Sequence, residues 1–405
     1  MKPSKCLKVS PPGMNRQYHH YRHSIFPLVI AVSLALLFIG EMPCRASEEE
    51  VGAPLKKRRE EAAQLLGAGK THEAGAIYRE LAAESKTSLG PNHRFTLITR
   101  KDAAMVAAAE GELKEADAEL HEVLKAQTAT LGPDDADILA TRDGICSVLF
   151  FQQRYAEAEQ EFQALLKVEE KALGPENAST VGTRDSLAAV LFTRQKYPEA
   201  AREWRAVFEE QQRIFGAADP KTQTTRVNLA NALLQGNELD AAEAEWRAIL
   251  KSRQEQFGPE NVETLNAREN LGLSLMFQKK NAEAEKEFTA IGEIAERTLG
   301  AEHPTTLAYR MHLAVAINGL GRHNEAEAKF RELLAVSERA LGPENPITFQ
   351  SCQILADLLK KSGKRDEARL LARRAWESEK KALGPMHPQT KDCEALVKEL
   401  ESPKP

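Results

Sequence analysis

Small and apolar residues recur along this chain with a constant period of 42 residues. Each period ends in a Leu-Gly or Phe-Gly pair, and no residue is inserted between successive pairs. The glycines of these pairs are Gly90, Gly132, Gly174, Gly216, Gly258, Gly300, Gly342 and Gly384. A period held this strictly is typical of an array built from one repeated supersecondary unit. Positions in each repeat are numbered below from the glycine that ends the preceding repeat, so that position 26 after Gly300 is Ala326, and the first repeat is numbered from residue 48.

The second half of each repeat predicts an amphipathic helix. Position 26 is alanine in all eight repeats, from Ala74 to Ala368, and a large apolar residue follows one helical turn later in seven of them. These residues at position 30 are Tyr78, Leu120, Phe162, Trp204, Trp246, Phe288 and Phe330. We expect the alanine to let a neighbouring helix approach closely and the large side chain to fill the core beside it.

The first half of each repeat predicts a second amphipathic helix, because position 13 is often leucine, position 14 is small and position 17 is aliphatic. The sequence also marks where this helix begins. After Gly342, which is expected to end the preceding helix in a left-handed conformation, Asn345 can cap the next helix and Pro346 suits its first turn. The array is therefore expected to be a series of helix pairs.

These columns resemble the tetratricopeptide repeat family. The small residue at position 14, the alanine at 26 and the aromatic residue at 30 have the spacing of that family's Gly, Ala and Phe signature. The 42-residue length is similar to the long repeats of kinesin light chains and of many bacterial repeat proteins. The resemblance covers about residues 55–384 and implies an all-α, right-handed superhelical solenoid of about eight antiparallel helix pairs, followed by a capping helix and tail in residues 385–405. HEAT and armadillo repeats have similar lengths but do not predict this Ala and aromatic pair.

Residues 1–46 do not belong to the array. A basic leader precedes an uncharged, mostly apolar run from Ile25 to Gly40, and small residues precede Ser47, which is the layout of a secretory signal peptide. The alternative is an uncleaved membrane anchor, but the apolar run is short for a membrane span, which favours cleavage. The expected location is therefore exported, in the periplasm, at the cell surface or in the medium. Either Met1 or Met14 could be the start, and residues 47–54 are expected to be a linker.

Composition narrows the range of partners. The full chain has a formal net charge of −5, and removing residues 1–46 takes away six basic and one acidic residue, which leaves a net charge near −10. This balance argues against a nucleic-acid partner, and membrane contact is expected only if the N-terminal segment is retained. Among the cysteines, Cys352 and Cys393 lie at nearly equivalent places in successive repeats, and whether they form a disulfide stays open.

A column of arginines occupies position 10. Its members are Arg58, Arg100, Arg142, Arg184, Arg226, Arg268 and Arg310. An arginine ladder could bind an acidic ligand. Because the column recurs in seven of the eight repeats, broken only by Cys352, we favour a structural interpretation, in which the stems pack between helices and the guanidinium groups reach a carbonyl or carboxylate.

Residues that vary between repeats are more informative about a partner. By resemblance, tetratricopeptide arrays bind extended or helical peptides on a concave groove lined by the first helices, here at positions 8, 11, 12, 15 and 18. Position 18 carries an apolar stripe, and amides that could pair with a peptide backbone lie beside it. The predicted groove residues are Phe150, Phe192, Asn228, Asn231, Leu234, Asn266, Asn270 and Met276. The stripe could instead only fill space between adjacent helices.

The sequence contains no pattern typical of an enzyme. Its histidines are scattered without metal-ligand spacing, and it has no glycine-rich phosphate loop. We therefore expect no catalytic residue, metal, cofactor or small-molecule substrate. The expected function is a protein interaction scaffold, more often monomeric than oligomeric, that binds a peptide or protein partner in the groove. The alternative is a structural component that self-associates in an envelope or surface assembly.

Overall fold

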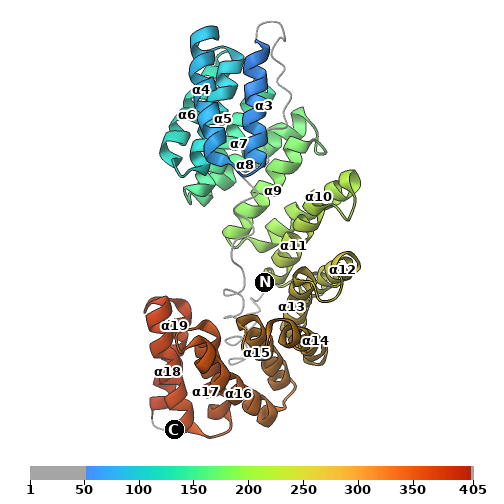
Figure 1. The fold of residues 1–405 in the computed structure, drawn as a ribbon, viewed down its shortest axis with the longest axis vertical. Helices are drawn as coiled ribbons and strands as arrows, with labels where there is room; N and C mark the ends of the chain where they lie inside the picture. The colour runs from blue at the N-terminus through green and yellow to red at the C-terminus, as the bar shows by residue number, and fades with distance from the viewer. Residues whose placement is uncertain (1–51, 403–405) are drawn as a thin grey trace, which may run out of the picture. The chain divides into compact units, whose positions relative to one another are not determined.

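The computed structural model describes residues 52–402. These residues form seventeen α-helices and no β-strand (Figure 1). The helices are α3 (Ala53–Gly67), α4 (Thr71–Leu89), α5 (Arg94–Ala109), α6 (Leu113–Thr128), α7 (Ala136–Phe151), α8 (Tyr155–Ala172), α9 (Ala178–Thr193), α10 (Tyr197–Phe215), α11 (Pro220–Gln235), α12 (Leu239–Phe257), α13 (Val262–Phe277), α14 (Asn281–Leu299), α15 (Pro304–Gly319), α16 (His323–Leu341), α17 (Pro346–Lys361), α18 (Arg365–Leu383) and α19 (Pro388–Glu401). The expected series of eight helix pairs and a final capping helix is confirmed. The predicted signal peptide lies outside the described residues.

The described residues divide into two compact units, each of which is a two-layered helical array. The N-terminal unit, residues 52–232, contains α3 to α10 and most of α11; the C-terminal unit, residues 233–402, contains the end of α11 and α12 to α19. Consecutive helices pack together from α3 to α10 and from α12 to α19. First helices also contact each other, α5 with α7 and α7 with α9 in one unit, and α13 with α15 and α15 with α17 in the other. The first helices of each unit therefore form a continuous layer.

The predicted core seam is confirmed. The alanine at position 26 is at most 1% exposed in every repeat, and the large residue at position 30 is at most 2% exposed. Position 14 must be small because it faces this large residue. A Cβ atom added to Gly272 would lie 2.7 Å from Cζ of Phe288, closer than two carbon atoms can pack.

The first helix of each repeat from α5 onward, and the final helix α19, begin with a side-chain cap. In each case the capping side chain accepts a hydrogen bond from the backbone N–H two residues later, which satisfies a donor left over at the helix start. The capping residues are His93, Asp135, Asn177, Asp219, Asn261, His303, Asn345 and His387. The cap predicted at Asn345 is confirmed, with 2.9 Å between its Oδ1 and the nitrogen of Ile347.

The glycines that end the second helices have a different conformation from the one expected. Gly342 has φ 81° and ψ 171°, so its φ is positive, but its ψ is far from that of the left-handed α conformation. This region is essentially restricted to glycine, because a Cβ atom would clash there. Gly132 is the exception among the eight glycines, since α6 ends earlier, at Thr128, and Gly132 is not among the positive-φ residues.

A second backbone feature, at position 21, was not expected from the sequence. The turn between the two helices of each repeat places this residue at positive φ. Four repeats have glycine there, whereas Gln153, Gln195, Asn237 and Lys279 adopt φ between 61° and 65°. Residues other than glycine are sterically strained in this conformation.

Two further features limit what the described part of the chain can do. No helix within residues 52–402 is long and apolar enough to span a bilayer. Cys146, Cys352 and Cys393 are buried free thiols, and burial raises the pKa of Cys352 to about 11. At neutral pH these thiols are therefore protonated and poorly reactive.

Candidate inner face of the first helices

The apolar residues predicted to line the groove are largely buried in the two units. Phe150 is 9% exposed, Leu234 is 2% exposed and Met276 is 1% exposed, while Phe192 is half-buried. The Phe150 ring packs against Tyr155, with 5.3 Å between ring centroids. These side chains therefore contribute mainly to packing and offer a partner little surface.

Phe192 shows the same packing on α9. Its ring centroid lies 5.2 Å from that of Tyr197 and 5.6 Å from that of Trp204, both on the next helix, α10. The ring thus fills the space between the two helices of its own repeat, and only part of it is open to solvent.

The predicted amides are more accessible. Asn266 is exposed, whereas Asn228, Asn231 and Asn270 are half-buried. In the C-terminal unit, Nδ2 of Asn270 donates a hydrogen bond to the backbone oxygen of Asn266 at 2.9 Å. The Oδ1 atoms of Asn231 and Asn270 are enclosed and accept no hydrogen bond. Each therefore keeps an unused acceptor on a first helix.

The position-10 arginines support the structural interpretation made from the sequence. Nε of Arg100 lies 2.6 Å from Glu119, and Nη1 of Arg184 lies 2.8 Å from Glu203, so each binds a carboxylate 19 residues later, in the second helix of its repeat. With their charges neutralised inside the array, these arginines are poor candidates for an acidic ligand.

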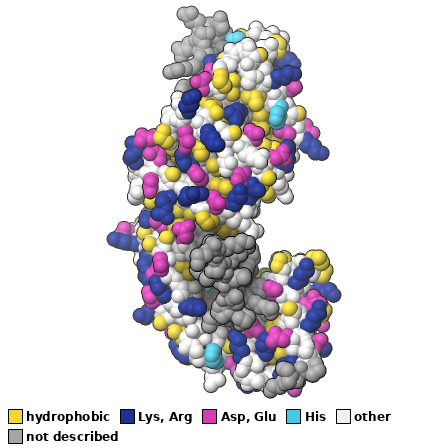
Figure 2. Space-filling view, turned by 180° about the vertical axis from the view of Figure 1, so that it is seen from behind, with side chains coloured by type: hydrophobic (Ala, Val, Ile, Leu, Met, Phe, Trp, Pro, Cys, Tyr) yellow, Lys and Arg dark blue, Asp and Glu magenta, His cyan; other side chains and the backbone are white. Residues whose placement is uncertain are grey.

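A second set of ion pairs joins the starts of successive second helices. In each pair a glutamate of one repeat binds a basic side chain 37 residues later, and the shortest N–O distance is 2.7 Å. The pairs are Glu159–Lys196, Glu243–Lys280, Glu285–Arg322 and Glu327–Lys364. On the face shown in Figure 2, basic and acidic side chains are accordingly interspersed over the described residues.

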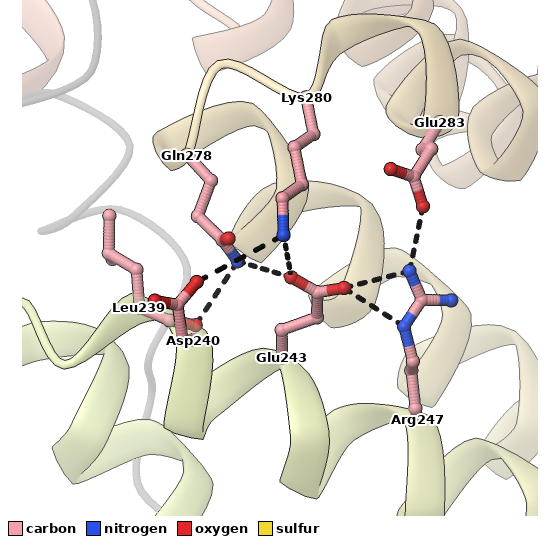
Figure 3. Close-up of polar contacts among 7 residues, drawn as sticks. All are labelled: Leu239, Asp240, Glu243, Arg247, Gln278, Lys280 and Glu283. Carbon is pink, nitrogen blue, oxygen red and sulfur yellow. Dashed lines mark hydrogen bonds and ion pairs between the residues drawn. The ribbon is translucent and has the colours of Figure 1, made fainter.

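Glu243 is the centre of one such cluster (Figure 3). Its carboxylate accepts hydrogen bonds from Lys280 at 2.7 Å, from Gln278 at 2.7 Å and from Arg247 at 2.8 Å. Burial by itself would raise the pKa of Glu243, but these hydrogen bonds outweigh it and hold the pKa at about 2. The cluster joins α12 to the start of α14 and leaves the carboxylate no unused capacity for a ligand.

Sequence reasoning missed a polar ladder inside the layer of first helices. Nε of Arg59 lies 2.7 Å from Asp102, and Nδ1 of His312 lies 3.5 Å from Glu269. In both pairs a residue at position 11 faces position 12 of the next repeat, 43 residues later. The signal was present in the sequence as charged residues at these two positions, but the register between repeats was needed to pair them.

Acidic members of this ladder differ in whether they have a counter-charge. Asp102 is fully buried between Arg59, at 2.7 Å, and Nζ of Lys101, at 3.1 Å. By contrast, burial raises the pKa of Asp143 to about 7 and that of Glu269 to about 7. Burial also raises the pKa of Asp185 to about 6, although a hydrogen bond from Trp204 opposes the shift. Perturbed acids of this kind mark candidate functional sites.

Within residues 52–402, no group of three or more His, Cys, Asp or Glu side chains could hold a metal ion. The polar groups on the first helices can instead supply hydrogen-bond acceptors from the amides and negative charge from the acids. This chemistry suits the binding of a polypeptide segment.

Comparison with known proteins identifies the repeats. Residues 180–221, 264–305 and 307–378 match the tetratricopeptide repeat family. A search of curated proteins finds no match.

Solved structures share the fold at low sequence identity. The apo form of RapI gives a TM-score of 0.58 at 10% identity, over 86% of this chain and 97% of RapI. A tetratricopeptide repeat protein from Parabacteroides merdae gives 0.50 at 13% identity, over 76% and 99%. BtubC (BKLC) from P. vanneervenii gives 0.44 at 17% identity, over 62% and 95%. By the family models, the helix pairs in residues 180–221, 264–305 and 307–378 are tetratricopeptide repeats, and the other helix pairs follow the same 42-residue period.

Proposed function

We propose that this protein is a non-catalytic scaffold that binds a segment of a protein partner along the inner face of its first helices. The family models that match the chain are models of tetratricopeptide repeats, which form an interaction fold. The observation that carries the proposal is that each unit has, on a first helix, an enclosed amide oxygen that accepts no hydrogen bond, on Asn231 in one unit and on Asn270 in the other. Buried polar atoms are normally paired, so an unused acceptor on a binding face favours a ligand that supplies the donor.

A backbone N–H of a bound segment is the simplest such donor. Asn266, Asn270 and Glu269 lie together on α13, and none of the three side chains is fully buried. An extended peptide could therefore pair its backbone with the amides while its side chains contact the acids.

The test is selection of peptides from a random library with the full chain, followed by affinity measurement with variants. Asn266→Ala/Asn270→Ala should weaken binding at least tenfold, because two backbone hydrogen bonds are lost. Asn324→Ala is the matched control, since Asn324 is exposed on the second helix α16. If both variants bind as well as the original chain, the partner does not use this face. Leu234 is unsuitable as a test position, because at 2% exposure its replacement would disturb the core.

Self-association is the alternative function, and exposed apolar residues at the end of the C-terminal unit favour it. Leu370 is 66% exposed and Met386 is 74% exposed. Sedimentation at increasing protein concentration distinguishes the two proposals. A measured mass equal to one chain at every concentration supports the scaffold. A mass that rises with concentration for the original chain, but not for the Leu370→Lys/Met386→Lys variant, supports self-association.

We also propose that residues 1–46 direct export and are then removed, with membrane anchoring as the alternative. Intact-mass measurement of the chain recovered from the source cells tests this. Loss of the mass of residues 1–46 supports cleavage, whereas the mass of the full chain in the membrane fraction supports an anchor.

A further inference from the structure

Two polar side chains one turn apart on α7 have buried atoms without hydrogen-bond partners. Asp143 is 9% exposed and Ser147 is 1% exposed. Oδ1 of Asp143 and Oγ of Ser147 are both enclosed, and neither takes part in a hydrogen bond. Enclosed polar atoms of this kind are costly, and two on the same face of one helix point to a missing partner. They lie at positions 11 and 15, which the resemblance to tetratricopeptide repeats places on the groove side of the first helices.

Asp185 adds a second carboxylate. It occupies position 11 of α9, the equivalent of Asp143, and α9 packs against α7 in the N-terminal unit. Its Oδ1 accepts a hydrogen bond from Nε1 of Trp204 at 2.8 Å. Among the described residues, neither Asp143 nor Asp185 has an ion pair, in contrast to Asp102 with its two. We name Asp143, Ser147 and Asp185 the α7–α9 acidic site.

The surrounding charges do not neutralise this site. Burial and the nearby Glu169 carboxylate on α8 raise the pKa of Asp143 to about 7, while Lys101 on α5 opposes the shift. Lys101 is already committed, since its Nζ lies 3.1 Å from Asp102. The site is therefore short of a positive charge when its carboxylates are ionised.

We propose that the α7–α9 acidic site binds an arginine side chain of the partner segment. This inference rests on the proposed function and specifies the partner's chemistry. A guanidinium group has five N–H donors, enough for the Asp143 carboxylate and the Ser147 hydroxyl oxygen on α7, and the Asp185 carboxylate on the neighbouring helix α9 adds negative charge to the site. Arginine is favoured over lysine because its cation is more weakly hydrated and costs less to bury.

The test compares peptides selected from the random library on the full chain at pH 8. Selected peptides should contain arginine, and replacing that arginine by glutamine should weaken binding at least tenfold. Asp143→Asn/Asp185→Asn should cause a similar loss, and combining the two changes should add little, because both remove the same interaction. Ser147→Ala should cause a smaller loss. Replacing the arginine by lysine should recover only part of the affinity.

The control variant is Asp240→Asn/Asp366→Asn. It removes the same two charges from α12 and α18, where the side chains are 97% and 90% exposed. Its binding should match that of the original chain, which separates a specific contact from the effect of net charge. Circular dichroism verifies that all variants remain helical.

Binding should also depend on pH. Because Asp143 must lose its proton to pair with the cation, affinity should fall as the pH is lowered from 8 to 6, and the Asp143→Asn/Asp185→Asn variant should lose this dependence.

The outcomes distinguish the two levels of the proposal. Peptides that depend on Asn266 and Asn270 but not on arginine or on the α7–α9 acidic site would overturn this inference and keep the proposed function. Peptides that depend on neither surface, or no selected peptides at all, would overturn both.

Discussion

Two buried aspartates at neighbouring positions of the repeat, Asp102 and Asp143, are expected to affect the free energy of unfolding in opposite directions. Asp102 lies between two cations, whereas Asp143 has no ion pair among the described residues. Removing one partner of a buried ion pair leaves an uncompensated charge, and removing an unpaired charge relieves a cost. The same substitution is therefore expected to have opposite effects at these two positions.

At pH 8, Asp102→Asn should lower the free energy of unfolding by about 2–4 kcal/mol, because Arg59 and Lys101 lose their shared carboxylate. Asp143→Asn should raise it, by up to about 4 kcal/mol, since the ordinary pKa of 3.8 is raised to about 7 by folding. Urea denaturation of both variants measures the difference. A loss of stability in Asp143→Asn would show that its carboxylate is stabilised by a contact.

The gain from Asp143→Asn should also depend on pH. A carboxyl group whose pKa is raised by folding binds its proton more tightly in the folded state, so it costs nothing below about pH 4. The cost grows between about pH 4 and pH 7 and is complete above pH 7. The stabilisation by asparagine should therefore be large at pH 8 and close to zero at pH 4, and urea denaturation at the two pH values checks this.

At the scale of the element, the turn inside each repeat contains an unfavourable backbone conformation in half of the array. Lys279 adopts φ 62°, and Gly321 has φ 79° at the same position of the next repeat. Lys279→Gly should therefore stabilise the protein by about 1 kcal/mol, and Gly321→Ala should destabilise it by a similar amount. Thermal denaturation of the two variants measures both effects. Equal melting temperatures would mean that the turn relaxes without cost.

The cluster around Glu243 is expected to stabilise the packing of α12 against α14. Glu243→Gln should cost about 1 kcal/mol at pH 7, a modest value because Lys280 and Arg247 are 40% and 47% exposed and their charges are partly screened by water. Asp240→Asn is the matched control, because Asp240 is 97% exposed and lies 4.0 Å from Lys280. It should change stability by less than about 0.5 kcal/mol.

The pH dependence of Glu243 has the opposite sign from that of Asp143. Folding lowers the pKa of Glu243 from 4.5 to about 2, so its contribution is fully present above about pH 4.5 and is lost as the pH falls through about 2. The difference between the original chain and Glu243→Gln should thus shrink between pH 7 and pH 3. If the difference in the free energy of unfolding between the two proteins did not change with pH, the effect of Glu243→Gln would come from packing and not from charge.

Much of each helix pair could be predicted from sequence, because the deciding interactions repeat at fixed spacing. Ala326 and Phe330 are buried as their column predicts, and Asn345 caps as its place before Pro346 predicts. Helical periodicity could not decide whether Phe150 and Met276 face the partner or the second helices. Both are apolar residues on the same face, and only the packing of neighbouring rings and helices determines their exposure.

The candidate site was harder to predict than the fold. Asp102 and Asp143 look alike in the sequence, and their difference comes from side chains of neighbouring repeats. Arg59 reaches Asp102 across 43 residues, so the charge balance depends on the register between helices. The conformation of Lys279 was missed because glycine marks that turn in only half of the repeats.

At the scale of the whole molecule, an array of repeats gains stability from contacts between nearest neighbours, so its ends need a cap. The final helix, α19, supplies this cap in the C-terminal unit. Cys393 on α19 is fully buried, with its Sγ 3.6 Å from the backbone oxygen of Ala372. Arg365 donates hydrogen bonds to backbone oxygens at the end of α19, including those of Glu399 at 2.6 Å and Ser402 at 2.7 Å.

Deleting residues 388–405 should therefore destabilise the end of the C-terminal unit first. Ala372 and Ala375 on α18 are fully buried and would lose part of their cover, so the amides of α17 and α18 should exchange with solvent at least tenfold faster. Amides of α3 to α8 should keep their rates, because in a nearest-neighbour array only the repeat beside the deleted helix loses contacts. Arg365→Ala should give a weaker form of the same local effect. Faster exchange along the entire chain after the deletion would show that the repeats unfold as one cooperative block, and the nearest-neighbour description would then be wrong for this array.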